Sequence, residues 1–328
     1  MRNLIRSPIL FATVALMLFR GGALAQTSAE AFPSRTVTLV VPYAPGGAAE
    51  KEARIYAAKL SGFMGQQFIV DLKPGGGTTI ATAYVAKSAP DGYTLLAVPS
   101  GFAIFPALYK DLPFDTLRDF APVTQMSKRT SVLIVPPAFP AKTFAEYISY
   151  AKANPGQINF GTSGSGDMVH LMGAWIHSAT NTVATFVHYK GTGALLPDLL
   201  AGRLTATASG LAVAPLIKAG KLRALAVTND NRAKLLPDVP TIAELAIPGF
   251  NAVVWQGYSA PASTPATTIS RLNDAFVRVA RSPDVIAALE SDGAVMVGNT
   301  PAEFRQVIIT ETARWRKLIQ DNGIQLEQ

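Results

Sequence analysis

Short apolar runs alternate with amphipathic segments along the first part of the chain. The runs at 37–41, 68–72 and 93–98 are rich in aliphatic and β-branched residues and end at Pro or Gly, which predicts buried strands. The segments between them, 47–60 and 78–88, carry apolar residues at helical spacing and predict helices. This βαβαβ order favours a parallel sheet that is covered by helices.

The same alternation restarts after residue 130. The predicted strands lie at 131–135, 158–161, 186–188, 204–208 and 222–227, and the predicted helices at 144–154, 168–178 and 194–201. Thr143 is placed to cap the first of these helices. The run at 255–260 predicts a returning strand. The three helices expected after it, at 267–281, 283–291 and 301–320, have no further strand beside them in sequence, so we expect them to cover the first unit.

The pattern predicts an α/β protein of two domains, each a mixed, mostly parallel sheet flanked by helices. We expect the chain to cross between them near 123–130 and again near 249–257. Domain 1 then comprises 26–126 plus 253–328, and domain 2 comprises 127–252. Two crossings make a hinge, and small-molecule sites favour domain interfaces and the carboxyl ends of strands. The sequence therefore predicts a ligand cleft at the hinge.

The N-terminal segment has the pattern of an export signal. Arg2 and Arg6 precede an apolar run at 9–19, and Ala23-Leu24-Ala25 fits the small-residue rule for cleavage. An uncleaved membrane anchor is the alternative, but the run is much shorter than the roughly 20 residues that a span needs. We expect a signal peptide at 1–25 and a soluble, exported mature protein.

Charge and composition exclude several classes of function. The formal net charge of +7 falls to +4 when the three arginines of the signal are removed, and no Lys/Arg run marks a nucleic-acid surface. The chain has no cysteine, which excludes disulfides, a thiol nucleophile and a Cys metal site. The mild positive excess favours anionic ligands.

Two predicted strands run into loops of small residues that open a helix. The first loop reads Tyr43-Ala44-Pro45-Gly46-Gly47-Ala48, and the second reads Thr162-Ser163-Gly164-Ser165-Gly166-Asp167. Glycine lets an anion approach the backbone, and the first N–H groups of a helix lack partners within it. Both loops are candidate ligand sites. An ordinary βα turn is the alternative for the first loop, and a plain N-cap is the alternative for Asp167.

The second loop does not fit the common catalytic motifs. Asp167 stands where a P-loop needs Lys, the third Gly of a dinucleotide fingerprint is absent, and neither Ser163 nor Ser165 has the flanking glycines of a nucleophile elbow. Ser163, Asp167 and His170 lie on one turn, whereas a catalytic triad draws its members from separate elements. We therefore expect no catalytic residues.

The remaining candidates are single residues. His170 and His177 are seven residues apart on one helix, wider than the spacing of three or four that zinc pairs use, so we expect no metal site. Ser100 and Ser209 follow the ends of predicted strands. Lys190 is either a solvated loop charge or the one cation near the cleft. Trp255 either packs at the returning strand or lines the cleft.

Phrases along the whole chain beyond the signal match one known family. They include "FPSRTVTLVVPYAPGG" at 32–47, "KPGGGTTIATAYVAKSAPDGYTLL" at 73–96, "HYKGTGALLPDLLAGRL" at 188–204 and "LPDVPTIAEL" at 236–245. The chain resembles the exported receptors of tripartite tricarboxylate transporters, also called Bordetella-uptake-type solute-binding proteins.

The resemblance implies a periplasmic-binding-protein type II fold that closes on a small carboxylate and delivers it to membrane permease subunits. It implies that the ligand is held by the facing loops 43–48 and 162–166, without a cofactor, in a monomer. A receptor that signals to a sensor kinase and, as an outside alternative, an exported hydrolase remain open. The residues expected to bind ligand are Tyr43, Ala44, Pro45, Gly46, Gly47, Ala48, Ser100, Thr162, Ser163, Gly164, Ser165, Gly166, Asp167, Lys190 and Ser209.

The chain also departs from the family pattern at places that bear on the ligand. Glu50 stands where the family usually has Asp, and Asp167 stands where it usually has a small or hydroxyl residue. Ala208 replaces a usual aromatic, which leaves extra room in the cleft. These departures predict an altered ligand preference, and the sequence does not name the ligand.

Overall fold

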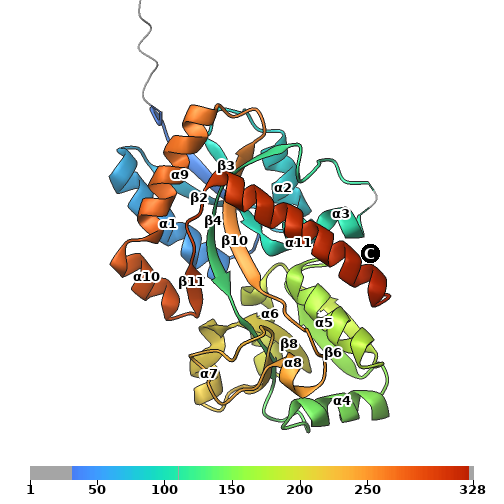
Figure 1. Cartoon of the computed structure of the whole chain (residues 1–328). Coiled ribbons are helices and arrows are strands. Elements are labelled where there is room, and N and C mark those ends of the chain that lie inside the picture. The colour runs from blue at the N-terminus through green and yellow to red at the C-terminus, as the bar shows by residue number, and fades with distance from the viewer. Residues whose placement is uncertain (1–31, 110, 325–328) are drawn as a thin grey trace, which may run out of the picture.

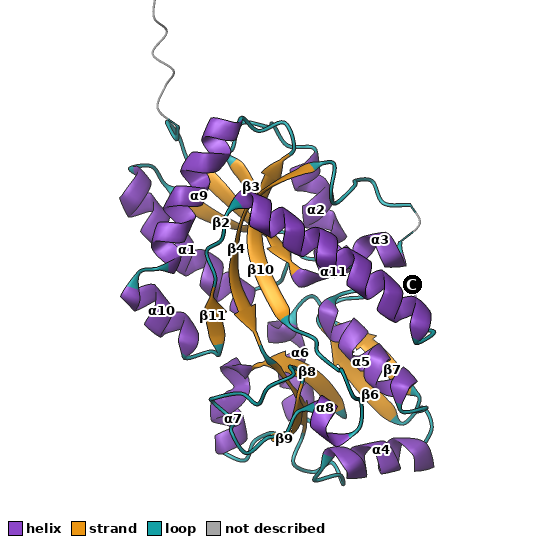
Figure 2. Ribbon diagram, in the orientation of Figure 1, coloured by secondary structure: helices purple, strands orange, loops and turns teal. Residues whose placement is uncertain are grey.

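The computed structural model describes residues 32–109 and 111–324 (Figure 1). The predicted signal peptide at 1–25 lies outside this range. Two sheets stand end to end, each with helices packed on it, and a pair of long strands, β4 and β10, runs from the first sheet toward the second (Figure 2). The protein is therefore an α/β protein with two mixed sheets, as predicted.

The first sheet has the strand order β11-β4-β10-β3-β1-β2. Its strands are β1 (Val37–Val41), β2 (Phe68–Leu72), β3 (Thr94–Pro99), β4 (Phe120–Arg129), β10 (Val254–Pro261) and β11 (Ala294–Met296). The helices beside it are α1 (Ala48–Met64), α2 (Thr79–Ala86), α3 (Phe105–Leu108), α9 (Ala266–Ala280), α10 (Pro283–Glu290) and α11 (Pro301–Asp321).

The second sheet has the strand order β7-β6-β8-β5-β9. Its strands are β5 (Ser131–Val135), β6 (Ile158–Thr162), β7 (Ala184–His188), β8 (Ala206–Gly210) and β9 (Arg223–Val227). The helices around it are α4 (Phe144–Ala153), α5 (Met168–Ala179), α6 (Thr192–Leu200), α7 (Ala214–Lys218) and α8 (Ile242–Leu245). The Thr143 side chain accepts a hydrogen bond from the backbone N–H of Glu146, which confirms the predicted N-cap of α4.

The expectation of mostly parallel sheets is wrong. In the described part of the chain, β1 pairs in parallel with β2 and β3, whereas β10 pairs antiparallel with β3 and β4, and β11 antiparallel with β4. The second sheet likewise combines parallel pairs of β6 with antiparallel pairs of β5. The chain that crosses between the sheets enters and leaves as antiparallel strands, which the repeated βα pattern did not reveal.

The hinge is shorter than the sequence predicted. Segment 123–130, expected to be a connection, is almost entirely strand β4, so the chain passes from one sheet to the other at Thr130. It returns through 251–253 into β10. Strand β11 was not predicted and gives the C-terminal helices a sheet partner. The domain limits 26–126 plus 253–328 and 127–252 stay a prediction.

Helix α11 joins the two units instead of covering only the first. Its Phe304 and Ile308 lie in the core beneath β3 and β10, as expected. Its Trp315 is buried in the core of the second unit and lies edge-on to Trp175 of α5, with ring centroids 5.9 Å apart. The Ser178 hydroxyl donates to the carbonyl of Asn322 at 2.6 Å. The C-terminal end of the chain therefore holds α5, the helix whose N-terminus reaches the cavity described next.

Candidate binding site

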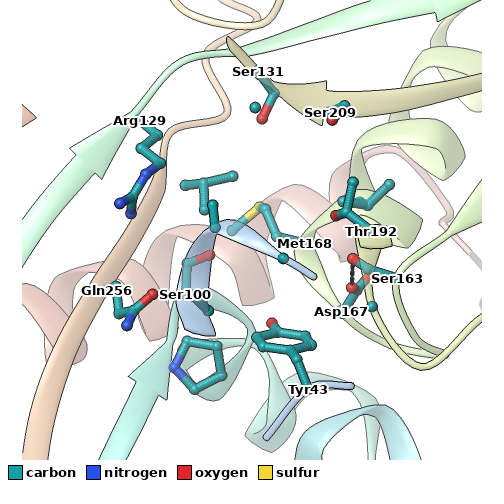
Figure 3. A pocket seen from close by; sticks show the side chains of 18 of the residues that line it. Tyr43, Ser100, Arg129, Ser131, Ser163, Asp167, Met168, Thr192, Ser209 and Gln256 are labelled. Carbon is teal, nitrogen blue, oxygen red and sulfur yellow. Dashed lines mark hydrogen bonds between the residues drawn. The ribbon is translucent and has the colours of Figure 1, made fainter. Parts of the chain in front are cut away.

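A cavity of about 110 Å³ lies between the two sheets. Loops at the carboxyl ends of β1, β3, β6, β7 and β8 line it, together with residues of the two crossing segments. Figure 3 shows side chains from both units converging on this space. In α/β proteins, ligands usually bind at the carboxyl ends of the strands, at a topological switch point of the sheet. The volume is far above the roughly 10–15 Å³ that one water needs.

Three helices begin at this cavity. Helix α1 follows Gly47 and helix α6 follows Gly191, and neither glycine can supply a side-chain cap. Residues of both first turns, Ala48 and Thr192 among them, line the cavity. The first N–H groups of a helix have no partner within it and carry the positive end of the helix dipole. The α1 and α6 ends therefore offer backbone donors to an anion.

The third helix, α5, is capped differently. Asp167 is its N-cap and accepts from the backbone N–H of His170 at 2.9 Å. The hydroxyl of Ser163 donates to the other carboxyl oxygen of Asp167, as the dashed line in Figure 3 marks. Both residues line the cavity. The two interpretations of Asp167, helix cap or cavity residue, are therefore compatible.

Burial makes Asp167 a weaker acid than usual. Only 2% of the residue is exposed, and this desolvation raises the pKa of its carboxyl to about 6, against the lowering effect of the bonds from Ser163 and His170. The carboxyl is therefore largely ionised at neutral pH and largely protonated near pH 5.

Asp167→Asn is expected to remove a pH dependence of stability. Because folding raises this pKa from 3.8 to about 6, the stabilisation is fully present below the unfolded value and is lost as the pH rises through 6. Asn caps helices as well as Asp does. From pH 4 to pH 7, the free energy of unfolding of the variant should rise by about 2 kcal/mol relative to that of the parent. Urea unfolding at both pH values measures this change. If the variant and the parent differed in free energy of unfolding by the same amount at pH 4 and at pH 7, this prediction would be wrong.

Arg129 supplies a cation to the cavity wall. It ends β4, is 5% exposed, and forms an ion pair with the fully buried Glu52 of α1. Its Nη1 donates to the hydroxyl of Ser127 at 2.8 Å. Within residues 32–109 and 111–324, its Nε is buried without a hydrogen-bond partner, and so are Nε2 of Gln256 and Nε1 of Trp255. All three residues line the cavity. Buried N–H groups nearly always have an acceptor in folded proteins, so these three donors suggest that a bound group supplies one.

Eight of the fifteen residues expected to bind ligand line this cavity. They are Tyr43, Ala44, Gly47, Ala48, Ser100, Ser163, Asp167 and Ser209. They come from four different loops of the two units, and the fold brings them together. Burial and, to a lesser extent, the Asp167 charge raise the pKa of Tyr43, so its phenol remains a neutral donor.

The other seven predicted residues lie beside the cavity. Gly164, Ser165 and Lys190 line a neighbouring, more open cavity of about 420 Å³, together with Gly75, Gly76 and Gly77. The side chain of Lys190 is exposed, so the cation at the main cavity is Arg129. Thr162, Pro45, Gly46 and Gly166 have contacts of their own.

Those contacts explain why the four residues are turned away. The hydroxyl of Thr162 is hydrogen-bonded to Nδ1 of His188 at 2.7 Å. The backbone N–H of Gly46 donates to the carboxylate of Glu50 at 2.7 Å, and Pro45 and Gly46 pack against Gly193 of α6. Gly166 packs against Tyr109, and its N–H donates to Nδ1 of His170. Glu50 thus holds the first loop in place, and the N–H of Gly46 that it occupies is not available to a ligand.

The sequence did not single out Arg129, Ser131, Thr192 or Gln256, all of which line the cavity. Arg129 and Ser131 flank the crossing at Thr130, and Gln256 lies next to Trp255 at the return crossing. Trp255 does both things considered for it: it lines the cavity, and it packs edge-on against Phe304 at 5.6 Å. The useful signal was the crossing itself, because residues at a hinge lie between the two domains.

The side chains around Ser163 do not form a hydrolytic site. Ser163 donates its proton to a carboxylate, not to a histidine. Nδ1 of His170 accepts from the N–H of Gly166 at 3.0 Å, and burial, together with the nearby His188, lowers the pKa of His170 to about 3. Among the described residues, no group of His, Asp and Glu side chains is arranged to hold a metal ion, and no helix is long and apolar enough to span a membrane.

The two units touch at two places beside the cavity. The N–H of Ala44 donates to the carbonyl of Lys190 at 2.8 Å. The hydroxyl of Tyr109 donates to the carbonyl of Ser165 at 3.2 Å, and Gly77 lies directly against the same carbonyl. The structure is therefore a closed one, in which a ligand would be enclosed.

Comparison with known proteins agrees with this geometry. A family model for the tripartite tricarboxylate transporter family receptor matches residues 52–324. Protein BugT of Bordetella pertussis is 33% identical over 321 residues, which cover 97% of this chain and 98% of BugT. Among solved structures, Rpa4515 of R. palustris, determined with adipate, is 35% identical with a TM-score of 0.85 over 89% of this chain and 99% of that one.

The periplasmic binding protein BugD is 29% identical, with a TM-score of 0.86 over 90% of this chain and 100% of BugD. The likeness to BugD and the two mixed sheets show the predicted two-domain fold of periplasmic binding proteins. The matching family model describes receptors, and BugD is a periplasmic binding protein. From its match over most of its length, the chain belongs to the tripartite tricarboxylate transporter receptor family.

Proposed function

We propose that this protein is a periplasmic receptor that captures a small organic acid in the cavity between its two sheets and delivers it to the permease subunits of a tripartite tricarboxylate transporter. It acts after removal of the segment 1–25 and as a monomer. Hinge motion at Thr130 and at 251–253 opens and closes the cavity. The ligand-binding residues are the eight predicted residues that line the cavity, joined by Arg129, Ser131, Thr192 and Gln256.

One observation carries this proposal. Two residues that line one cavity, Arg129 and Gln256, have buried N–H groups (Nε and Nε2) without an acceptor in the described part of the chain, and the uncapped N-termini of α1 and α6 meet at the same space. A buried donor that lacks a partner costs roughly 1–3 kcal/mol, so an acceptor is expected there when the protein works. A carboxylate supplies several acceptor positions in one group.

The relatives support the same chemical class. The related Rpa4515 was determined with adipate, a dicarboxylate. Among the described residues, the cavity wall provides donors for one carboxylate but no unpaired cation, because Arg129 is paired with Glu52 and Lys190 does not line the cavity. Recognition of the acid therefore depends on hydrogen bonds in a dry cavity.

Mass spectrometry of the protein, purified gently and then denatured, should release a small organic acid. Isothermal titration calorimetry against mono-, di- and tricarboxylates should then give binding for members of this class. A ligand at a hundred times its dissociation constant adds about 2.7 kcal/mol to the free energy of unfolding, which a thermal-shift assay detects easily. Release of a neutral or cationic compound, with no carboxylate bound in calorimetry, would reject the proposal.

A further inference from the structure

We propose that the ligand is a monocarboxylate that carries a hydrogen-bond donor, a hydroxyl, amide or amine, at its other end, and that Asp167 selects it against dicarboxylates. The inference rests on the proposed function, because it assumes that the cavity binds a carboxylate. It comes from the way in which the two opposite walls of the cavity differ.

One wall of the cavity is built from donors. Figure 3 shows Arg129 and Gln256 on the same side, with Ser100 between them and the centre of the cavity. Arg129 and Gln256 each retain a buried N–H without a partner among the described residues. A carboxylate end of the ligand fits this wall because it accepts hydrogen bonds and donates none.

The opposite wall carries a pair of acceptors beside the phenol of Tyr43 and Thr192 of α6 (Figure 3). Asp167 and Ser163 lie there, bonded to each other (Figure 3). Because Ser163 gives its single proton to Asp167, the hydroxyl presents only lone pairs to the cavity. The Asp167 carboxylate accepts bonds inside the protein from the backbone N–H groups of His170 and Val169 and from the Ser163 hydroxyl, and its two oxygens offer further acceptor positions. A second carboxylate placed beside these two residues would meet the negative charge of Asp167 and the lone pairs of Ser163.

Within residues 32–109 and 111–324, no cation is paired with the carboxylate of Asp167. The groups that face Asp167 are the phenols of Tyr43 and Tyr109 and the hydroxyl of Ser163. Burial and, to a smaller extent, the charge of Asp167 raise the pKa of both phenols, so they stay neutral. His170 of its own helix is neutral. The dipole of α5 offsets part of the charge but is already engaged in the cap. An anionic group is therefore repelled at this wall, whereas a hydroxyl, amide or amine is bound.

The test compares probes of equal shape that differ in one group. Succinamate, glutaramate and adipamate each carry an amide where succinate, glutarate and adipate carry the second carboxylate. By calorimetry at pH 7.5, the parent should bind the amide member of the pair that fits at least tenfold more tightly than its dicarboxylate partner. Asp167→Asn, which keeps a cap and supplies an N–H donor, should reduce this ratio at least tenfold and bind the dicarboxylate more tightly than the parent does.

A matched control removes the same charge elsewhere. Asp115 accepts from the backbone N–H groups of Leu117 and Arg118 in a turn outside the cavity, so Asp115→Asn should leave the ratio unchanged. Equal or tighter binding of the dicarboxylate by the parent would overturn the inference and leave the carboxylate receptor intact. Failure of every probe in both series would overturn the two together. If Asp167→Asn does not fold, the ratio measured for the parent decides alone.

Discussion

Replacing Arg129 with methionine is expected to lower the free energy of unfolding by about 3–5 kcal/mol, more than any other single change outside the apolar cores. Glu52 is fully buried, and its carboxylate is held by Arg129 and by the hydroxyl of Ser127. Methionine fills similar space but leaves the carboxylate without a countercharge in a dry environment. Urea unfolding at pH 7.5 measures the loss directly.

Two further variants separate the buried charge from a general effect of losing an arginine. Arg35 pairs with Asp91 in the open, with 62% of its side chain exposed, so Arg35→Met should cost less than about 1 kcal/mol. Combining Arg129→Met with Glu52→Gln removes both charges and should restore at least half of the loss. A double variant no more stable than Arg129→Met would show that the cost comes from packing instead.

The pairing of Arg129 with Glu52 also explains how one residue serves both the fold and the site. The ion pair ties the end of β4 to α1, and α1 begins at the first ligand loop. The same arginine lines the cavity, and its Nε has no hydrogen-bond partner among the described residues. If a carboxylate supplied the missing acceptor, its binding would be coupled to the position of the hinge strand.

The sequence predicted the loops of the site better than its charges. Both small-residue loops could be found because a strand, a Gly-rich turn and a helix follow one another locally, and that local order decides which residues meet the strand end. The direction of a side chain depends on what packs around it, so Lys190, adjacent to Gly191, could not be distinguished from a cleft residue. Arg129 was overlooked because its segment was taken for a connection, whereas β4 runs through it as a paired strand.

Asp167 illustrates a limit of a different kind. The sequence offered two roles as alternatives, a helix cap and a cavity residue, and the structure shows both at once. The bond from Ser163 joins the two roles, since it fixes the cap and at the same time withdraws the Ser163 hydroxyl proton from the cavity. Such a bond depends on the turn of the loop, and the sequence of the three intervening residues does not reveal it.

Gly77→Ala is expected to weaken ligand binding at least a hundredfold by preventing closure. Gly77 lies in the loop before α2, and a Cβ at this position would lie 1.9 Å from the carbonyl oxygen of Ser165 in the other unit. Backbone atoms cannot rotate away from this contact as a flexible side chain could. The variant can relieve it only by keeping the two units apart, which leaves the cavity open to water and its two walls too far apart for one ligand.

The matched control for Gly77→Ala is Gly65→Ala, because both glycines have left-handed backbone conformations, with φ of 58° and 72°. Each substitution costs about 1 kcal/mol of stability for that conformation, but a Cβ on Gly65 meets nothing within 4 Å. Both variants should therefore lose similar stability in urea, and only Gly77→Ala should lose calorimetric affinity for the carboxylate that the parent binds most tightly. In small-angle X-ray scattering with that ligand, the parent and Gly65→Ala should become more compact while Gly77→Ala does not. Equal affinities for the two variants would mean that the contact between Gly77 and Ser165 plays no part in closing the protein on its ligand.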